Sequence, residues 1–391
     1  MFGIFLRLGC TSFGGPVAHL GYFRTEFVSS RAWLSEPAFA DLVALAQFLP
    51  GPASSQTGFA IGLRQGGYRG GLAAWLGFTL PSALLMLCFA ASASVIIAAP
   101  IGLVALHGLK LAAAAIVGQA VWGMARSLCR TWHTRLIALA GLALALGVSG
   151  ALSPVMVIIA GGMAGLFIGR LVLPPSSNMI LEPLPIAITP RASFIALTLC
   201  AALLAASFLP AHGLALLFAA FYRAGALVFG GGHVVLPMLH QAVVAPGWVS
   251  NGGFLAGYGA AQALPGPLFT FAAFLGALVQ MNHGAPAGLA GATIALVAIF
   301  LPGLLAMFGM LPLWHGLRRR PTAQATITGV NAATVGLLAA AFYNPVLTSA
   351  IAGPLDLTIA LGGFLLLQLR RTPPLAIVAL CIAMAVLRAQ F

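Results

Sequence analysis

The stretch QFLPGPASSQTGFAIGLR, residues 47–64, places Pro50-Gly51-Pro52 inside a run otherwise apolar enough to form a membrane helix. The stretch QALPGPLFTFAAFLGAL, residues 262–278, repeats this arrangement with Pro265-Gly266-Pro267. Proline lacks a backbone N–H and clashes with the preceding helical turn, so each Pro-Gly-Pro should interrupt its helix. Two interruptions of the same kind in one chain require a common explanation.

The composition restricts the class of protein. The 391-residue chain is 61% hydrophobic and only 6% charged. No soluble domain of this length could bury so much apolar surface, and charge-poor runs of about 20 residues recur along the chain. We therefore predict an all-α polytopic protein embedded in a lipid bilayer. The formal net charge of +13 comes mostly from arginines in short loops, which indicates positive-inside orientation and not nucleic-acid binding.

The chain reads as two copies of one unit. FLRLGCTSFGG (5–15) aligns with FYRAGALVFGG (221–231), and WLSEPAFADLVALAQFLPGP aligns with WVSNGGFLAGYGAAQALPGP in the same order. Pro81 aligns with Pro302. We predict an N-terminal repeat over 1–172, a cytoplasmic linker over 173–191, a connecting transmembrane helix over 192–210 and a C-terminal repeat over 211–391.

The arginine-rich loops predict how the copies are inserted. Counting each Pro-Gly-Pro run as one crossing gives about thirteen spans, and nearly all loop arginines then fall on one side of the membrane. Arg388 is the exception. Basic loops of one copy correspond to uncharged loops of the other, so the copies should be inverted. We favour a broken helix at each Pro-Gly-Pro, with a re-entrant hairpin as the alternative. The spans are 1–15, 38–65, 71–98, 102–125, 136–150, 154–172, 193–209, 214–231, 252–280, 286–311, 323–343, 355–369 and 373–389.

Inverted repeats with interrupted helices are the arrangement of secondary transporters, whose substrate site lies near the midplane. Each interruption frees backbone N–H groups at the start of a second half-helix, where the helix dipole favours an anion. After Pro52 the residues Ser54, Ser55 and Gln56 add polar groups, whereas the second copy offers only Thr270. The alternative is that both kinks serve packing alone.

Three cations lie within the apolar runs. Arg7 and Arg223 occupy matching positions, and Arg223 lies near mid-span. A buried arginine needs a partner, and an anionic substrate would supply one. Snorkelling and pairing with backbone carbonyls are the alternatives. Lys110 aligns with Asn331 and is a further candidate.

Other candidate binding residues surround the interruptions. Glycines would allow the backbone to approach an anion closely, and two glutamines precede the Pro-Gly-Pro motifs. Packing roles are the alternative for both groups. The full set of predicted substrate-binding residues is Arg7, Gly14, Gly15, Gln47, Pro50, Gly51, Pro52, Ser54, Ser55, Gln56, Lys110, Arg223, Gly230, Gly231, Gly232, His233, Gln262, Pro265, Gly266 and Pro267.

Several kinds of site are absent from the sequence. No span carries a carboxylate near its middle, no His/Cys/Asp cluster suggests a metal, and no Walker-type loop suggests ATP hydrolysis. We therefore predict no enzyme, no cofactor and no metal ion, and a transporter driven by membrane potential or an ion gradient. A membrane-embedded enzyme remains a remote alternative, and a homodimer is left open.

The motifs SFGGPVAHLGYFRTEFV, WLSEPAFADLVALAQFLPGPASSQTGFAIGLRQGGYRGGLAAWLGFTLPS and GALVFGGGHVVLPML closely resemble the long, two-domain form of the chromate transporter family. The resemblance covers nearly the whole chain. It implies a bacterial inner-membrane protein that exports chromate and confers chromate resistance, with sulfate or another oxyanion as the alternative substrate. The family motifs include the polar and glycine residues named above, together with Phe13, Pro16 and His19.

Overall fold

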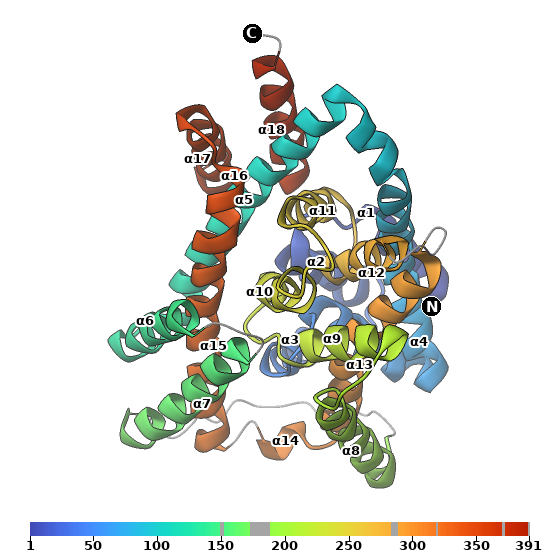
Figure 1. Cartoon of the computed structure of the whole chain (residues 1–391). Helices are drawn as coiled ribbons and strands as arrows, with labels where there is room; N and C mark the ends of the chain where they lie inside the picture. The colour runs from blue at the N-terminus through green and yellow to red at the C-terminus, as the bar shows by residue number, and fades with distance from the viewer. Residues whose placement is uncertain (149–151, 173–187, 283–287, 318–319, 370–371, 390–391) are drawn as a thin grey trace.

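The computed structural model describes residues 1–148, 152–172, 188–282, 288–317, 320–369 and 372–389, and over these residues every regular element is a helix (Figure 1). The elements are α1 Phe2–Thr11, α2 Gly15–Phe23, η1 Arg24–Ser30, α3 Glu36–Phe48, α4 Ala53–Ala98, α5 Pro100–Leu128, α6 Trp132–Gly147, α7 Ser153–Val172, α8 Pro190–Ala206, α9 Gly213–Ala226, η2 Gly232–Val234, α10 Val235–Leu239, η3 His240–Val244, α11 Asn251–Ala263, η4 Leu268–Thr270, α12 Phe271–Asn282, α13 Leu289–Met310, α14 Trp314–Leu317, α15 Pro321–Ala341, η6 Phe342–Leu347, α16 Thr348–Ala350, α17 Pro354–Leu369 and α18 Pro374–Arg388.

The helices are those of a polytopic membrane protein. Among the described residues, four helical stretches are long and apolar enough to cross a bilayer: Ala53–Ser92, Ile101–Leu128, Leu289–Met310 and Pro321–Ala350. Large apolar side chains also cover the outer surface; Phe194 is 71% and Leu369 is 77% exposed. In water such a surface would aggregate, whereas in lipid it is solvated. The predicted all-α membrane class is therefore confirmed.

The molecule has two lobes, and both halves of the chain contribute to each (Figure 1). We call α1–α4 with α8–α13 the hairpin lobe, and α5–α7 with α15–α18 the pillar lobe. In the pillar lobe α15 packs between α6 and α7 of the first half, and α5 packs against α17 and α18 of the second half. Each half thus supplies the long helix around which the other half completes its fold.

Close packing in the pillar lobe depends on small residues. A Cβ at Gly141 would lie 2.8 Å from the Ala333 carbonyl oxygen of α15. A Cβ at Gly108 of α5 would lie 2.6 Å from the Ile382 Cα of α18. Such approaches are how helices associate in lipid, where no hydrophobic force holds them together. They explain part of the high glycine content.

The interrupted helices differ from the prediction. The helices do end before each Pro-Gly-Pro and restart after it. However, α11 and α12 lie side by side, because the Tyr258 ring is 5.8 Å from the Phe271 ring and a Cβ at Gly257 would lie 2.7 Å from Phe274 Cδ1. A collinear broken helix would separate these residues by several turns. The element is therefore the hairpin alternative, not the broken helix that we favoured.

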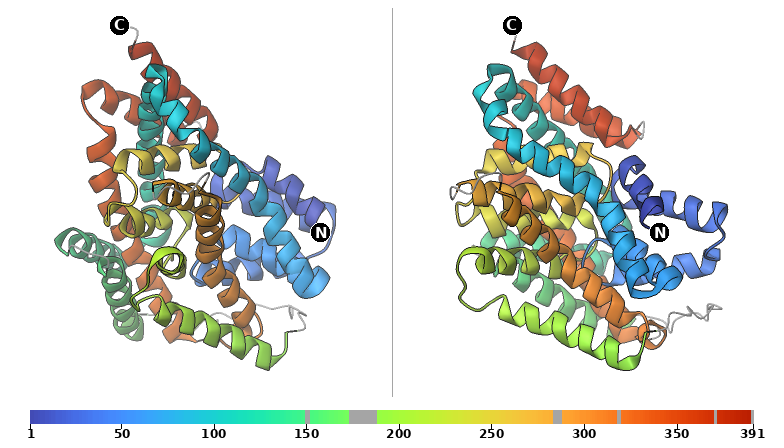
Figure 2. Two further views of the ribbon diagram at one scale, coloured as in Figure 1. Left: turned by 45° about the vertical axis from the view of Figure 1, so that its right-hand side comes forward. Right: turned by 90° about the vertical axis from the view of Figure 1, so that its right-hand side faces the viewer.

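The same arrangement recurs around the other turns. Phe5 of α1 stacks on Phe27 of η1 with ring centroids 5.0 Å apart, so α1 and α2–η1 form a hairpin. Likewise α3 packs against α4, and α9 packs against α10 and η3. In the right-hand view of Figure 2 the blue helices of residues 1–50 lie at one edge and the yellow-green α9–α11 at the opposite edge. Two hairpins of each copy thus approach the centre from opposite sides.

This correction changes the number of crossings but not the side of each later loop. Each copy contains two hairpins that the prediction counted as one crossing each, so the expected count becomes about nine instead of about thirteen. Removing two crossings together leaves every later loop on its assigned side. It also moves Arg24 and Arg31 to the arginine-rich side. Residues 318–319 and 370–371, which carry some of the loop arginines, lie outside the described residues, and membrane orientation stays a prediction.

The structure also accounts for Arg388, which the loop pattern placed on the other side. Arg388 donates a hydrogen bond of 2.5 Å to the Asp356 carboxylate, and Asp356 is fully buried. Because its charge is neutralised, Arg388 need not obey the positive-inside rule. Most of the predicted linker, residues 173–187, lies outside the described residues, and α8 occupies the range of the predicted connecting helix. The domain boundaries stay predictions.

Candidate functional site

The four hairpin tips meet, and two reciprocal hydrogen bonds join them. The tips are residues 12–14 and 49–52 in the first copy, and 227–231 and 264–267 in the second. The Gly51 N–H donates to the Val228 carbonyl at 2.8 Å, and the Gly266 N–H donates to the Ser12 carbonyl at 2.9 Å. Gly51 and Gly266 are corresponding residues, as are Ser12 and Val228. Each copy's Pro-Gly-Pro is therefore bonded to the other copy's glycine-rich turn.

The two central glycines cannot be replaced without strain. Gly51 has φ +115° and Gly266 has φ +91°, which side chains rarely tolerate. A Cβ at Gly51 would lie 3.0 Å from the Gly303 Cα, and one at Gly266 would lie 2.8 Å from the Ser82 Oγ. Gly303 and Ser82 follow the aligned prolines Pro302 and Pro81. The tips thus rest against matching points of α13 and α4.

The first Pro-Gly-Pro tip presents buried polar groups at the start of α4. Ser54, Ser55 and Gln56 are each at most 2% exposed. The Ser55 hydroxyl has no hydrogen-bond partner among the described residues. The Gln56 amide donates to the Pro50 carbonyl at 2.9 Å and to the Gly303 carbonyl at 3.0 Å, so it braces the tip. The hydroxyls and the free backbone donors of α4 are the groups that could contact an anion.

Further buried groups around this tip were not in the predicted set. The Ser12 hydroxyl is buried without a partner among the described residues, as is Nε2 of His19. His19 Nδ1 lies 3.4 Å from Ser54 Oγ, which brings α2 to the start of α4. The signal in the sequence was that His19 closely follows the first glycine turn, but a single histidine in an apolar run is ordinarily structural.

The second Pro-Gly-Pro tip satisfies its own polar groups. His233 Nδ1 lies 2.9 Å from the Tyr258 hydroxyl and 3.4 Å from Gln262 Nε2. Thr270 donates its hydroxyl hydrogen to the Pro267 carbonyl at 2.8 Å. Gln47, which corresponds to Gln262, is exposed and makes no comparable contact. The two tips match in backbone but not in side-chain chemistry.

Arg223 lines a cavity of about 790 Å³ at the boundary of the lobes. The cavity walls come from the α6–α7 junction, α9, η3 and η6, and no carboxylate lies among the described lining residues. The half-buried guanidinium donates to the Ser207 carbonyl and lies 5.3 Å from the centroid of the Phe208 ring. Among the described residues no acid pairs with Arg223, and its contact with the Ser207 carbonyl is of the kind that the sequence left open as an alternative; its role in binding stays a prediction.

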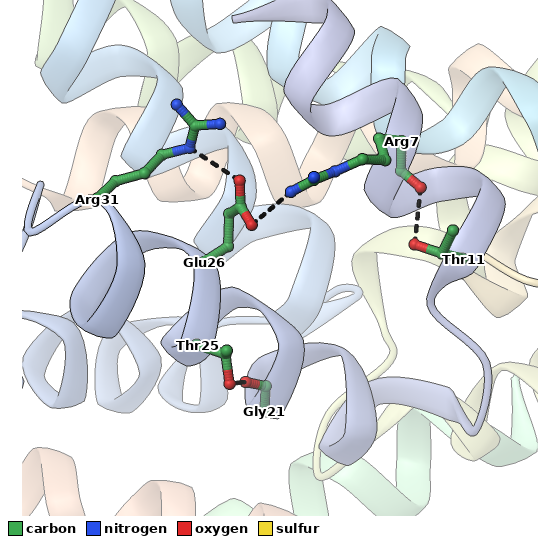
Figure 3. Close-up of polar contacts among 6 residues, drawn as sticks. All are labelled: Arg7, Thr11, Gly21, Thr25, Glu26 and Arg31. Carbon is green, nitrogen blue, oxygen red and sulfur yellow. Dashed lines mark hydrogen bonds and ion pairs between the residues drawn. The ribbon is translucent and has the colours of Figure 1, made fainter.

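Arg7 differs from Arg223, although the two positions correspond. Figure 3 shows Arg7 and Arg31 both pointing at Glu26. The Arg7–Glu26 distance is 2.6 Å and the Arg31–Glu26 distance is 2.8 Å. The Arg7 side chain is 61% exposed. Arg7 thus has a carboxylate partner within its own copy, which the sequence argument did not anticipate, and its role in binding stays a prediction.

Lys110 lies apart from the tips. It is half-buried on α5, where a Cβ at Gly252 of α11 would lie 3.0 Å from its Nζ. No hydrogen bond or ion pair joins Lys110 to another described residue. The aligned Asn331 does reach a tip, because a Cβ at Gly230 would lie 3.5 Å from its side-chain oxygen. The alignment was therefore a poor guide to the position of Lys110.

A buried ionic cluster near Lys110 was missed. Asp356 accepts hydrogen bonds from Arg388 at 2.5 Å and from the Ala352 N–H at 3.0 Å. His107 Nε2 lies 3.0 Å from the same carboxylate. The cluster joins α5 of the first half to α17 and α18 of the second. Its residues are far apart in the chain, so only the shared membrane side of Asp356 and Arg388 could have signalled it.

Over the described residues the arrangement offers hydrogen-bond donors and positive charge. Among the described residues, no group of three or more His, Cys, Asp or Glu side chains could hold a metal ion. What the tips do offer is a buried, partly unsatisfied polar surface within the hairpin lobe. Such a surface suits a small polar or anionic solute.

Comparisons with known proteins identify a family. The family model described as Chromate transporter matches residues 1–166 and 215–386. The chain is 30% identical to the chromate transport protein of Pseudomonas aeruginosa, over 87% of this chain and 79% of that protein. It is 28% identical to the chromate transport protein of Cupriavidus metallidurans, over 96% and 89%, and 29% identical to a probable one of Synechococcus elongatus, over 86% and 81%. No solved structure matches the chain significantly.

Proposed function

Because the chain belongs to the chromate transporter family, we propose that it is a secondary transporter that exports chromate from the cytoplasm across the bacterial inner membrane and so confers chromate resistance. Chromate is a tetrahedral divalent oxyanion. The proposed binding residues are those predicted above, centred on the hairpin tips. Membrane potential or an ion gradient supplies the energy.

One observation carries this proposal. At the point where the two copies exchange hydrogen bonds, the first glycine turn buries the Ser12 hydroxyl and the start of α4 buries the Ser55 hydroxyl, both without partners among the described residues. An unsatisfied buried hydroxyl costs about 1–3 kcal/mol. That cost is offset when a bound oxyanion accepts the missing hydrogen bonds. The start of α4 adds backbone donors and the positive end of its dipole.

Arg223 and Arg7 lie on opposite sides of the tips, where each would attract an anion that approaches or leaves the site. Arg223 belongs to a hairpin that enters from one side, and Arg7 to a hairpin that enters from the other. Arg223 stands in a cavity without a carboxylate among its described lining residues. A divalent anion leaving a negative interior gains about 4.6 kcal/mol per 100 mV, twice the value for one charge. Export of a dianion therefore needs no coupled ion.

The test is chromate uptake into inverted membrane vesicles with an imposed potential. We expect Arg223→Gln to reduce uptake at least tenfold, because the cavity then loses its positive charge. Arg126→Gln is the matched control, since Arg126 is exposed and its guanidinium lies 4.9 Å from the centroid of the Trp122 ring. Full activity in Arg223→Gln would remove Arg223 from the mechanism, and no uptake by the unmodified protein would refute the function.

The alternative within this class is a carrier of sulfate or another oxyanion. The hydroxyls and backbone donors at the tip recognise a tetrahedral oxyanion without identifying its central atom. Competition by sulfate, molybdate and phosphate against labelled chromate separates the substrates. Stronger inhibition by sulfate than by unlabelled chromate would assign sulfate as the preferred substrate.

A further inference from the structure

His19 is a buried titratable group that the proposed function does not use. It lies on α2, directly after the first glycine turn, and is only 1% exposed. Nδ1 lies 3.4 Å from Ser54 Oγ, at the start of α4. Nε2 has no hydrogen-bond partner among the described residues. A buried ring nitrogen without a partner is costly, so the position requires a reason.

The surroundings of the ring contain no counter-charge. The groups around it are the Ser54 hydroxyl, the Phe78 ring, whose centroid is 5.3 Å away, and the backbone carbonyl of Ser12. No charged side chain of the described residues makes a hydrogen bond or ion pair with it. The titratable side chains on its own element and on the elements packed around it are Tyr22 of α2, Arg7 and Cys10 of α1, Arg24, Glu26 and Arg31 of or next to η1, Arg64, Tyr68, Arg69 and Cys88 of α4, and His233 and Tyr258 of the second copy.

The corresponding histidine of the second copy has a different environment. His233 lies 2.9 Å from the Tyr258 hydroxyl and is adjacent to Gln262. The two residues after the second Pro-Gly-Pro are Leu268 and Phe269, which offer no hydroxyl. Thus only the first tip combines a histidine that has an unused nitrogen with serine hydroxyls and a helix start. An anion bound there would be the first negative charge beside the His19 ring.

We propose, resting on the transport function above, that His19 takes up one proton when a divalent oxyanion binds at the first Pro-Gly-Pro tip, so that each anion crosses with one proton. In the empty site burial without a carboxylate keeps the imidazole neutral. The bound dianion stabilises the imidazolium, which forms when Nε2 accepts a proton from the aqueous side that delivers the anion. The same proton is released with the anion on the opposite side. His19 is a coupling residue and carries no covalent chemistry.

The coupling has a measurable electrical consequence. Transport of a dianion with one proton moves one net negative charge, whereas transport of the dianion alone moves two. At equal pH, a tenfold anion gradient is then balanced by about 60 mV in the coupled case and about 30 mV in the uncoupled case. A difference of one pH unit shifts the balancing potential by about 60 mV only when a proton travels with the anion.

The experiment uses the full-length protein in proteoliposomes with potassium–valinomycin clamps and radiolabelled chromate at mildly alkaline pH, where chromate is a dianion. The potential that stops net flux is measured with and without a pH gradient. We expect the unmodified protein to show the pH-dependent shift and His19→Gln to lose it while still moving chromate. His212→Gln, at an exposed position before α9, should retain the shift.

Each result has one meaning. No chromate flux in the unmodified protein refutes the transport function itself. If the potential that stops net flux corresponds to two charges per anion and does not change with the pH gradient, only the proton coupling is overturned. An unchanged shift in His19→Gln overturns the role of His19. If His19→Gln loses net flux, exchange of labelled for unlabelled chromate is measured: retained exchange supports the proposal, and lost exchange assigns His19 to folding and overturns it.

Discussion

A substitution at Gly257 distinguishes a hairpin of α11 and α12 from a collinear broken helix, because it should destabilise the hairpin and stabilise the collinear helix. Gly257 faces α12, where a Cβ would lie 2.7 Å from Phe274 Cδ1 and 2.9 Å from Phe271 Cε2. Phe274 is 2% exposed and stacks on Phe89, so its ring has little room to move. Gly257→Ala should therefore force overpacking that costs about 1–3 kcal/mol. In a collinear broken helix the same change would stabilise by about 1 kcal/mol through helix propensity.

We expect Gly257→Ala to lower the free energy of unfolding by about 1–2 kcal/mol once the propensity gain is subtracted. The assay is unfolding of the purified protein by sodium dodecyl sulfate in detergent micelles, followed by tryptophan fluorescence. Gly253→Ala is the matched control in the same helix, because its Cβ would meet no atom closer than Ser250 Oγ at 3.2 Å. It should be neutral or stabilising.

A double-mutant cycle identifies the clash. Adding Phe274→Leu to Gly257→Ala should cost less than the sum of the two single changes, with a coupling of about 1 kcal/mol. The hairpin is refuted if Gly257→Ala is as stable as the unmodified protein and shows no coupling to position 274. A disulfide between Gly257→Cys and Phe274→Cys, formed on mild oxidation, would be an independent confirmation of proximity.

Three further predictions concern charge and the tips. Asp356→Asn should cost about 1–3 kcal/mol in the same unfolding assay, because a buried hydrogen-bonded carboxylate is lost; unchanged stability would contradict this. The hydrogen bond from Arg24, and its charge, hold the pKa of the Glu36 carboxyl below its usual value. That stabilisation is complete above the unfolded pKa and is lost as pH falls through the lower folded pKa, so Glu36→Gln should flatten the acid side of the stability profile. Ser55→Ala should raise the KM for chromate about tenfold, whereas Thr270→Ala, whose hydroxyl already has a partner, should not.

The sequence predicted the class of fold and the pairing of motifs well, because both depend on local signals. Apolar run length requires membrane helices, and two prolines around a glycine stop a helix in any context. The alignment also placed Gly51 and Gly266 at equivalent points, and the reciprocal hydrogen bonds agree with that alignment. These features are properties of short segments and need no knowledge of tertiary contacts.

The direction of the chain after each interruption could not be predicted from the same signals. A half-helix that continues and one that turns back have identical periodicity, and most loop arginines fall on the same side in both cases. The choice is made by packing of α11 on α12 through Tyr258, Phe271 and Phe274. The partners of Arg7 and Arg388 were missed for a similar reason. Glu26 and Asp356 become neighbours only after the hairpins and the pillar lobe have formed.

The exchange of long helices in the pillar lobe bears on how such a protein is made. Until α15 has been synthesised, α6 and α7 lack the helix that packs between them. In the same way, α5 lacks its partners α17 and α18. Neither half can therefore mature alone, and a ribosome must deliver nearly the entire polypeptide before the lobe can close. Two separately translated halves could reach the same end state only by inserting in opposite senses and finding each other within the bilayer.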